Sequence, residues 1–214
     1  MTNPQMRTEL RAKISEYFRE KIAKYGANPK GVDWKDKHSQ NLRFEQLLKI
    51  IDVEKPVTLN DLGCGYGASF LYLSQETSVK ILKYYGYDIC PEMLVNARNL
   101  VSDERASFVE SNEILFNADY SICSGIFNAK LDTELPEWEE FILGTLSNMN
   151  EKSSKGFAFN CLTTYVDYKE DHLYYGDPLF FFNFCERNFS RYVTLIHDYE
   201  LYEWTILVRK KFGT

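Results

Sequence analysis

The run at residues 59–68, LNDLGCGYGA, places an acid and three alternating glycines between a β-rich segment and a helical one. Glycine lets the backbone turn tightly and approach a ligand closely, and the N-terminus of the following helix attracts anionic groups. The spacing Gly63-x-Gly65-x-x-Ala68 also satisfies the dinucleotide fingerprint, whose third position is Gly or Ala. The run therefore fits two kinds of ligand, a dinucleotide or another nucleoside cofactor.

Two aspartates favour a nucleoside that carries an amino acid. Asp61 stands two residues before the first glycine. There its carboxylate can accept hydrogen bonds from an ammonium group, whereas it would repel a pyrophosphate. Asp88 closes the next β-rich segment, about 25 residues after Gly63, where a carboxylate can bind both hydroxyls of a ribose. The pattern predicts an adenosyl or similar nucleoside with an amino-acid tail.

In these residues the sequence resembles the class I S-adenosylmethionine-dependent methyltransferases of the small-molecule type, from about residue 56 to residue 209. Asp61 and the alternating glycines look like the first motif of the family, and Asp88 looks like its ribose acid. The resemblance implies that S-adenosylmethionine is the cofactor, with its methionine part on the glycine run and apolar side chains at its adenine. It assigns the following residues to the cofactor: Asp61, Gly63, Cys64, Gly65, Gly67, Asp88, Ile89, Met93, Asn112 and Ser124.

Two of these positions follow later strands. The family commonly has an aspartate after its third strand, at the adenine amino group; Asn112 stands there instead. Its amide oxygen can accept the same hydrogen bond, and an ordinary turn residue is the alternative interpretation. Ser124 follows the fourth strand and is expected beside the sulfonium. The Asn/Asp-Pro-Pro-aromatic run of members that methylate nucleobase or glutamine nitrogens is missing here, which disfavours that chemistry.

Residues 31–44 look like the N-terminal cap of some small family members. Arg43 lies on the flank of an apolar helical stripe, and its planar fork can bind the cofactor's carboxylate at two points. A surface ion pair is the alternative. Trp34 can close over the ligand, or it can serve as a packing anchor. We expect Arg43 at the cofactor and Trp34 at the substrate.

The acceptor side has weaker signals. His197 lies at the turn of a terminal hairpin and is the first candidate for general base, because an imidazole exchanges protons near neutral pH. Tyr165 and Asn160 compete with it. An aromatic-rich insert at residues 165–182 contains His172 and several tyrosines that can line an acceptor pocket. The residues assigned to the substrate are Trp34, Phe127, Asn160 and Tyr174, and those assigned to catalysis are His197 and Tyr165.

Short β-rich runs alternate with helical patterns after Pro56, which is typical of a parallel sheet with helices on both faces. The predicted strands are 57–62, 83–89, 106–110, 120–123 and 156–162. The predicted helices are 10–25, a segment between Ser39 and Pro56, 68–75, 91–101 and 135–149, and Pro178 begins another. Two β-rich runs, 191–196 and 201–209, are too close for a helical crossover and should pair as an antiparallel hairpin.

The fold class predicted is therefore α/β, a doubly wound and mainly parallel sheet. The family resemblance implies seven strands in the order 3-2-1-4-5-7-6, with strand 7 antiparallel and a helical cap at the N-terminus. We expect residues 1–55 to form that cap or lid and residues 56–214 to form the cofactor-binding domain. No internal repeat or linker interrupts the chain.

Composition narrows the partners. The chain has 214 residues, 44% of them hydrophobic, and a formal net charge of -6, which argues against binding a long nucleic-acid duplex. The N-terminus has no apolar leader segment, and no apolar run is long enough to span a membrane. Five scattered cysteines without a Cys-x-x-Cys pair indicate buried thiols in a reducing compartment and predict neither disulfides nor a metal site. We expect a cytoplasmic monomer or homodimer.

The function predicted is transfer of a methyl group from S-adenosylmethionine to an O- or N-nucleophile of a small molecule. Two alternatives remain open on the sequence. One is an NAD(P)-dependent reductase built on the same glycine turn. The other is a non-catalytic scaffold or partner subunit that retains the cofactor-binding fold.

Overall fold

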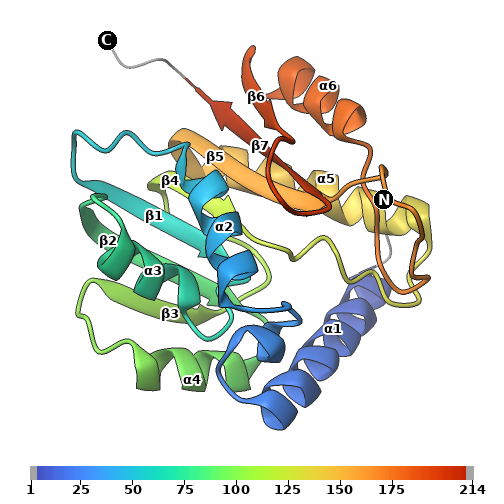
Figure 1. The fold of residues 1–214 in the computed structure, drawn as a ribbon, viewed down its shortest axis with the longest axis horizontal. Helices are drawn as coiled ribbons and strands as arrows, with labels where there is room; N and C mark the ends of the chain where they lie inside the picture. The colour runs from blue at the N-terminus through green and yellow to red at the C-terminus, as the bar shows by residue number, and fades with distance from the viewer. Residues whose placement is uncertain (1–3, 211–214) are drawn as a thin grey trace.

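A computed structural model describes the backbone of residues 4–210 and the side chains of residues 8–210. Seven strands form one sheet in the order β3-β2-β1-β4-β5-β7-β6 (Figure 1). The strands are β1 (Val57–Leu62), β2 (Ile81–Asp88), β3 (Ala106–Glu110), β4 (Ala118–Cys123), β5 (Ser153–Leu162), β6 (Tyr192–Ile196) and β7 (Glu203–Arg209). The first five strands are parallel to one another, and β7 runs antiparallel to both β5 and β6. The predicted sheet order and the antiparallel hairpin are confirmed.

The helices begin at residues that favour helix starts. Pro91, Pro136 and Pro178 each occupy the first turn of a helix, where a missing N–H costs nothing. Asp36 caps another helix through a reciprocal side-chain and backbone bond with Ser39. The helices are α1 (Pro4–Tyr25), η1 (Pro29–Val32, a 3₁₀ turn), α2 (Lys37–Leu48), α3 (Ala68–Glu76), α4 (Pro91–Leu100), α5 (Leu135–Lys152) and α6 (Pro178–Asn188).

Most element ends lie within three residues of the predicted ones, but α1 begins six residues earlier, at Pro4 rather than at residue 10. The strand β2 begins at Ile81 rather than at residue 83, and β5 begins at Ser153 rather than at residue 156. The hairpin's second strand begins at Glu203 rather than at residue 201. The carbonyl of Tyr202 accepts a hydrogen bond from the N–H of Thr163, outside the hairpin ladder, so the chain joins β6 only after this point.

Two hydrophobic clusters sandwich the sheet. One contains side chains of α5 and α6, and the other contains side chains of α2 and α3. Phe44, Leu47 and Leu48 of α2 are buried in the second cluster, so this part of the predicted 1–55 cap belongs to the core of the sheet. In contrast, α1 lies beside α4 and η1 at one end of the molecule (Figure 1).

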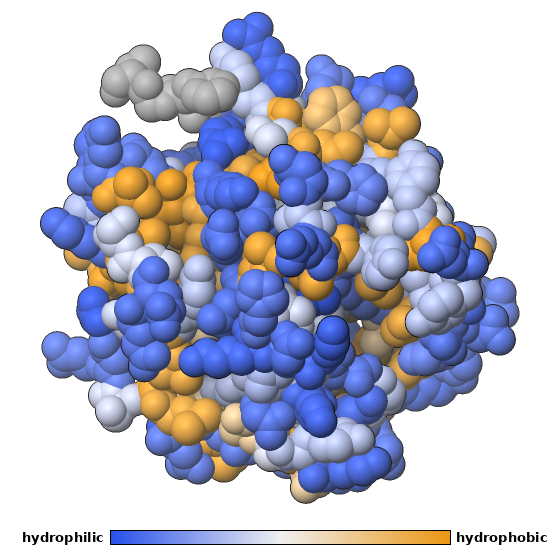
Figure 2. Space-filling view, viewed as in Figure 1, coloured by the Kyte–Doolittle hydropathy of each residue, from blue (hydrophilic) through white to orange (hydrophobic). Residues whose placement is uncertain are grey.

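Polar contacts attach α1 to the rest of the fold. The Ser15 hydroxyl donates to the carbonyl of Ile89, and Lys13 forms an ion pair with Asp132 at 2.7 Å. The face in Figure 2 is mostly hydrophilic, with scattered hydrophobic patches, in keeping with a chain whose formal net charge is -6. No helix in residues 4–210 combines the length and apolar character that crossing a membrane would require.

Candidate functional site

A cavity of about 550 Å³ lies where the parallel strands end. Its wall includes the segments that directly follow β1, β2, β3 and β4. This edge of a doubly wound sheet is where ligands bind, because the connections of neighbouring strands diverge there and leave a crevice. The opposite wall is made of residues from α1, η1, α2 and α5. The N-terminal helices α1 and α2 thus both help to enclose the cavity.

The glycine run is a left-handed turn between β1 and α3. Gly63, Gly65 and Gly67 have φ of 76°, 53° and 82°, a region that residues with a Cβ rarely adopt. At Gly63 an added Cβ would lie 2.1 Å from the Cγ2 of Ile126, and at Gly65 it would lie 3.0 Å from a methyl of Val32. The absence of side chains therefore lets this turn approach two neighbouring segments as well as the cavity.

Asp88 joins the end of β2 to the glycine turn. Its carboxylate accepts hydrogen bonds from the N–H of Gly65 and from the N–H of Cys90, each at 2.9 Å. Desolvation raises the pKa of Asp88 to about 6, although both N–H donors favour the charged form. The half-buried carboxylate also lines the cavity. It is held in place by the backbone and keeps lone pairs for a ligand.

Asp61 lies beneath the glycine turn and is 2% exposed. Its carboxylate accepts a hydrogen bond from the Tyr84 hydroxyl at 2.6 Å and one from the Ser69 hydroxyl. Burial raises the pKa of Asp61. The residue reaches the cavity wall, but two protein hydroxyls already share the carboxylate that we expected to face an ammonium group.

The segment after β4 brings unpartnered polar atoms to the cavity wall. Ser124 Oγ and Asn128 Nδ2 are buried and have no hydrogen-bond partner in the structure. Both residues line the cavity. The amide of Asn128 is oriented by its oxygen, which accepts the N–H of Leu162 at 3.1 Å. A ligand in the cavity can satisfy such groups, because an unmade buried hydrogen bond costs free energy.

The remaining predicted cofactor residues in this region also reach the cavity. Cys64, Ile89, Met93 and Asn112 line it, from the turn after β1, from the β2–α4 junction and α4, and from the segment after β3. Burial raises the pKa of the Cys64 thiol well above its usual value, so the thiol stays neutral. These residues supply a mainly apolar surface next to the Asp88 carboxylate.

Arg43 has a different partner from the one expected. Its Nε and Nη2 bind Glu203 of β7 at 3.0 Å and 2.7 Å, and its Nη1 donates to the carbonyl of Ser39 at 2.7 Å. The pair is buried, with Arg43 7% and Glu203 0% exposed. The fork that we assigned to a cofactor carboxylate binds Glu203, and the ion pair is buried rather than on the surface. Arg43 also lines the cavity, so its contact with the cofactor stays a prediction.

Trp34 lies on the wall of the cavity, as the lid interpretation requires, and it also packs against protein. The Arg43 guanidinium stacks on its ring at 3.7 Å from the centroid. On another side, the ring lies so close to Gly125 that a Cβ there would be 2.2 Å from it. Trp34 therefore packs against protein, and its closing over a ligand stays a prediction.

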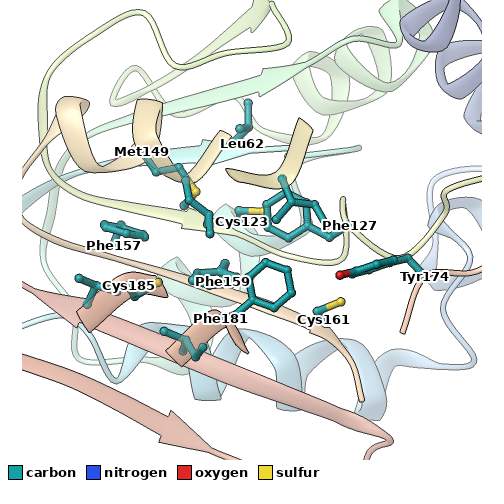
Figure 3. Packing of buried hydrophobic residues seen from close by; sticks show 14 of the residues in the cluster. Leu62, Cys123, Phe127, Met149, Phe157, Phe159, Cys161, Tyr174, Phe181 and Cys185 are labelled. Atoms are coloured by element: carbon teal, nitrogen blue, oxygen red, sulfur yellow. The ribbon is translucent and has the colours of Figure 1, made fainter. Parts of the chain in front are cut away.

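Three of the residues assigned to the substrate do not line the cavity. Phe127 and Tyr174 belong to the hydrophobic core between the sheet, α5 and α6 (Figure 3). The Tyr174 hydroxyl donates to Glu139 at 3.0 Å, and burial raises the pKa of that hydroxyl. Asn160 is fully buried within β5 and is bonded to Glu203 and to the backbone of Gly125. Aromatic packing buries Phe127 and Tyr174, and hydrogen bonds offset the cost of burying the Asn160 amide.

The two residues assigned to catalysis lie outside the cavity wall. Tyr165 is 62% exposed, and its ring lies 5.7 Å from the ring of His197, which is also exposed. Tyr165 lies on the connection that follows β5, and His197 lies on the turn between β6 and β7. A different histidine, His172, lines the cavity at its rim.

Several cavity residues were missed by reading the sequence. They come from one face of α1, one face of α5 and the far end of the chain, and they are Leu10, Ile14, Phe18, Glu137, Glu140, Phe141, Gly144, Thr145, Asn148 and Glu203. The spacing on α1 and α5 is helical, so a periodicity count identifies the face but not whether it meets the core or a cavity. Within residues 8–210 no cluster of His, Cys, Asp and Glu could hold a metal ion.

Comparison with known proteins agrees with this geometry. A family model described as a methyltransferase domain matches residues 60–119, which contain the glycine turn and Asp88. A Mycobacterium tuberculosis protein named "Putative methyltransferase Rv1506c" is 46% identical over 167 residues, which are 76% of this chain and 99% of that protein. The chain belongs to the class I S-adenosylmethionine-dependent methyltransferases. The predicted family is confirmed, and membership sets aside the reductase alternative.

Solved methyltransferases share the fold at low sequence identity. Magnesium protoporphyrin IX methyltransferase of Synechocystis, solved with bound SAH, has a TM-score of 0.65 at 12% identity and covers 96% of this chain and 100% of its own. The DhpI-SAM-HEP complex has a TM-score of 0.67 at 12% identity, with coverages of 97% and 99%. At this identity the likeness concerns the fold and does not extend to the acceptor.

The residues of this methyltransferase fit the family's cofactor. The left-handed glycine turn leaves backbone at the cavity wall, Asp88 keeps lone pairs beside it, and Ser124 Oγ lacks a partner there. Ile89 and Met93 supply an apolar surface next to Asp88. An adenosyl group with an amino-acid tail requires this combination of a carboxylate, close backbone and apolar contacts.

Proposed function

We propose that this protein methylates an O- or N-nucleophile of a small molecule, with S-adenosylmethionine bound between the glycine turn and Ser124. The observation that carries the proposal is that one cavity is lined both by the predicted cofactor residues and by side chains of α1 and α5, which we call the acceptor wall. Its volume of about 550 Å³ falls within the range of small-molecule sites, roughly 300–1,000 Å³. A macromolecule would need an open groove instead.

The residues divide the work as follows. Asp88 would bind the ribose hydroxyls, Ile89 and Met93 would contact the adenine, and Asn112 would accept a hydrogen bond from its amino group. The glycine turn and Ser124 would hold the methionine part. When bound, the cofactor would supply a methyl carbon on a sulfonium, which the lone pair of an acceptor could take while the carbon–sulfur electron pair stays on sulfur. Alignment of this kind contributes about 7–11 kcal/mol to such reactions.

The acceptor wall, formed by α1 and α5, includes apolar side chains that can contact a partly apolar acceptor. Leu10, Ile14 and Phe141 line this part of the cavity, and His172 lies at the rim. A neutral hydroxyl or an ammonium group must lose a proton before or during attack. We assign His172 as the group that receives it, in place of His197 and Tyr165, because it lines the cavity and they do not.

We also propose that the protein acts in the cytoplasm as a monomer or homodimer and does not bind nucleic acid. The net charge of -6 supports a metabolite over a polyanion. The five cysteines are buried and free, as expected of thiols in a reducing compartment.

Two measurements test the proposed function. Calorimetry with S-adenosylhomocysteine should show saturable binding with one site per chain. Incubation with methyl-labelled S-adenosylmethionine and a panel of small hydroxyl and amine compounds should then yield a labelled product, and His172→Ala should slow its formation by about 100-fold. Binding without any product across the panel would support the scaffold alternative. Absence of binding would overturn the proposal itself.

A further inference from the structure

A buried network surrounds Gly125, one residue after Ser124. Asn160 Oδ1 accepts the N–H of Gly125 at 2.7 Å, and Asn160 Nδ2 donates to Glu203 Oε2 at 3.1 Å. From the other side, Glu203 binds Arg43 at two points, and Arg43 stacks on Trp34. Two chains of contacts therefore start at Glu203 and end on the same glycine.

Only glycine fits at position 125 beneath the Trp34 ring. Its φ is 74°, and an added Cβ would lie 2.2 Å from the Trp34 ring, so the ring rests directly on the glycine. The next residue, Ile126, is in turn the side chain that would collide with a Cβ at Gly63 of the glycine turn. Residues 124–126 are thus clamped between the network and the cofactor's glycine turn.

Burial of the Glu203 carboxylate costs free energy. A fully buried carboxylate loses its hydration, and only close partners offset that cost. The side chain is 0% exposed and holds two partners, Arg43 and Asn160, from elements far apart in sequence. Replacing a buried ion pair by well-packed apolar residues is often neutral or stabilising in proteins. The network therefore calls for a role other than stability.

We infer that Glu203 is a positioning residue that fixes the 124–126 loop against the amino-acid end of the cofactor. This inference rests on the proposed function, because it places the methionine part beside Ser124. Glu203 acts through Asn160 on the backbone of Gly125 and through Arg43 on Trp34. The two hydrogen bonds that hold Asp88 come from Gly65 and Cys90, which are not members of this network, so the two ends of the cofactor should respond differently when the network is cut.

Two ligands separate the ends of the site. S-Adenosylhomocysteine has the adenosine and the amino-acid tail, whereas 5′-methylthioadenosine has the adenosine and sulfur without the tail. For Glu203→Gln, calorimetry should show about tenfold weaker binding of S-adenosylhomocysteine, the effect of losing one hydrogen bond to a charged group. Binding of 5′-methylthioadenosine should stay within about twofold of wild type. Arg43→Lys, which keeps the charge but loses the fork, should show the same selective loss.

Gly125→Ala tests the same clamp without disturbing a buried charge. Its Cβ should displace the Trp34 ring and again weaken only the ligand with the tail, so the proposal can be judged even when Glu203→Gln does not fold. Asp119→Asn is the matched control. It removes a carboxylate that binds Lys155 and Thr58 at the other end of β4, and it should lower stability without changing the ratio of the two affinities.

Equal weakening of both ligands in Glu203→Gln and Gly125→Ala would show a merely structural role and would overturn the inference, as would no change for either ligand. A wild-type protein that binds neither ligand would instead refute the proposed function. The two failures are therefore distinguishable in one set of titrations.

Discussion

Asp88 connects the chemistry of the site to the conformation of its backbone. The same carboxylate accepts the N–H groups of Gly65 and Cys90 and faces the cavity. The two N–H donors favour the charged form, while loss of hydration opposes it and raises the pKa of Asp88 to about 6. A small acidification therefore changes the group that we assign to the ribose.

Affinity for S-adenosylhomocysteine should fall about tenfold between pH 7 and pH 5, as Asp88 takes up a proton. The sign for stability is the opposite. The folded pKa lies above the unfolded one, so the folded state binds the proton more tightly, and the contribution of Asp88 to the free energy of unfolding increases as pH falls from about 6 towards 4. Calorimetry across this range measures the affinity, and Asp88→Asn should flatten the profile. A flat wild-type profile would contradict the assignment.

At the scale of elements, two loops of the site pack tightly against each other, and we call this contact the interlock. The glycine turn after β1 and the 124–126 loop after β4 meet where Ile126 occupies the space that a side chain at Gly63 would need. The strands β1 and β4 are hydrogen-bonded neighbours, which brings their carboxyl ends together. The close fit of the loops depends on this pairing and on the left-handed glycine.

Gly63→Ala should break the interlock. The Cβ would lie 2.1 Å from Ile126 Cγ2 at a φ of 76°, so we expect the free energy of unfolding to fall by about 1–3 kcal/mol and cofactor binding to weaken by more than about tenfold. Urea unfolding and calorimetry measure the two effects. Gly144→Ala is the control for the stability measurement, because nothing lies near its Cβ in helix α5 and it should stabilise by about 0.5–1 kcal/mol. Gly144 lines the cavity, so this control does not apply to the binding measurement. A Gly63→Ala protein as stable as wild type would contradict the interlock.

At the scale of the molecule, one sheet carries a hydrophobic cluster on each face, and the cavity opens at the strand ends between them and the N-terminal segment. All five cysteines are free and buried in this body. Burial raises the pKa of Cys90 to about 11 and that of Cys185 to about 12. Their thiols are therefore shielded and protonated at neutral pH.

Thiol reagents should consequently report global unfolding. In native protein at pH 8, Ellman's reagent should modify none of the five cysteines rapidly, and in denaturant it should modify all five. The absorbance of the aromatic thiolate that the reagent releases measures the number modified. A cysteine that reacts at once in the native state would show an opening of the core that the structure lacks.

The chain's local patterns determined much of the site. The glycine spacing, Asp61 and Asp88 lie within or directly after predicted strands, and such short-range signals specify backbone turns through steric and hydrogen-bonding rules that act over a few residues. For the same reason, most strands and helices were predicted to within a few residues, although α1 begins at Pro4 rather than at residue 10. The order of the strands came from the family resemblance carried by those motifs.

The tertiary structure alone decided which partners meet across the fold. Arg43 and Glu203 are separated by 160 positions in the chain, and nothing in the spacing of either residue indicates the other. The sequence shows that Phe127 and Tyr174 are aromatic, but it does not show that they face the core. It predicts that His197 lies at a turn, but it does not show that this turn lies outside the cavity. A sequence pattern reports which side chains are apolar or polar, whereas the packing of distant elements determines which of them enclose a ligand.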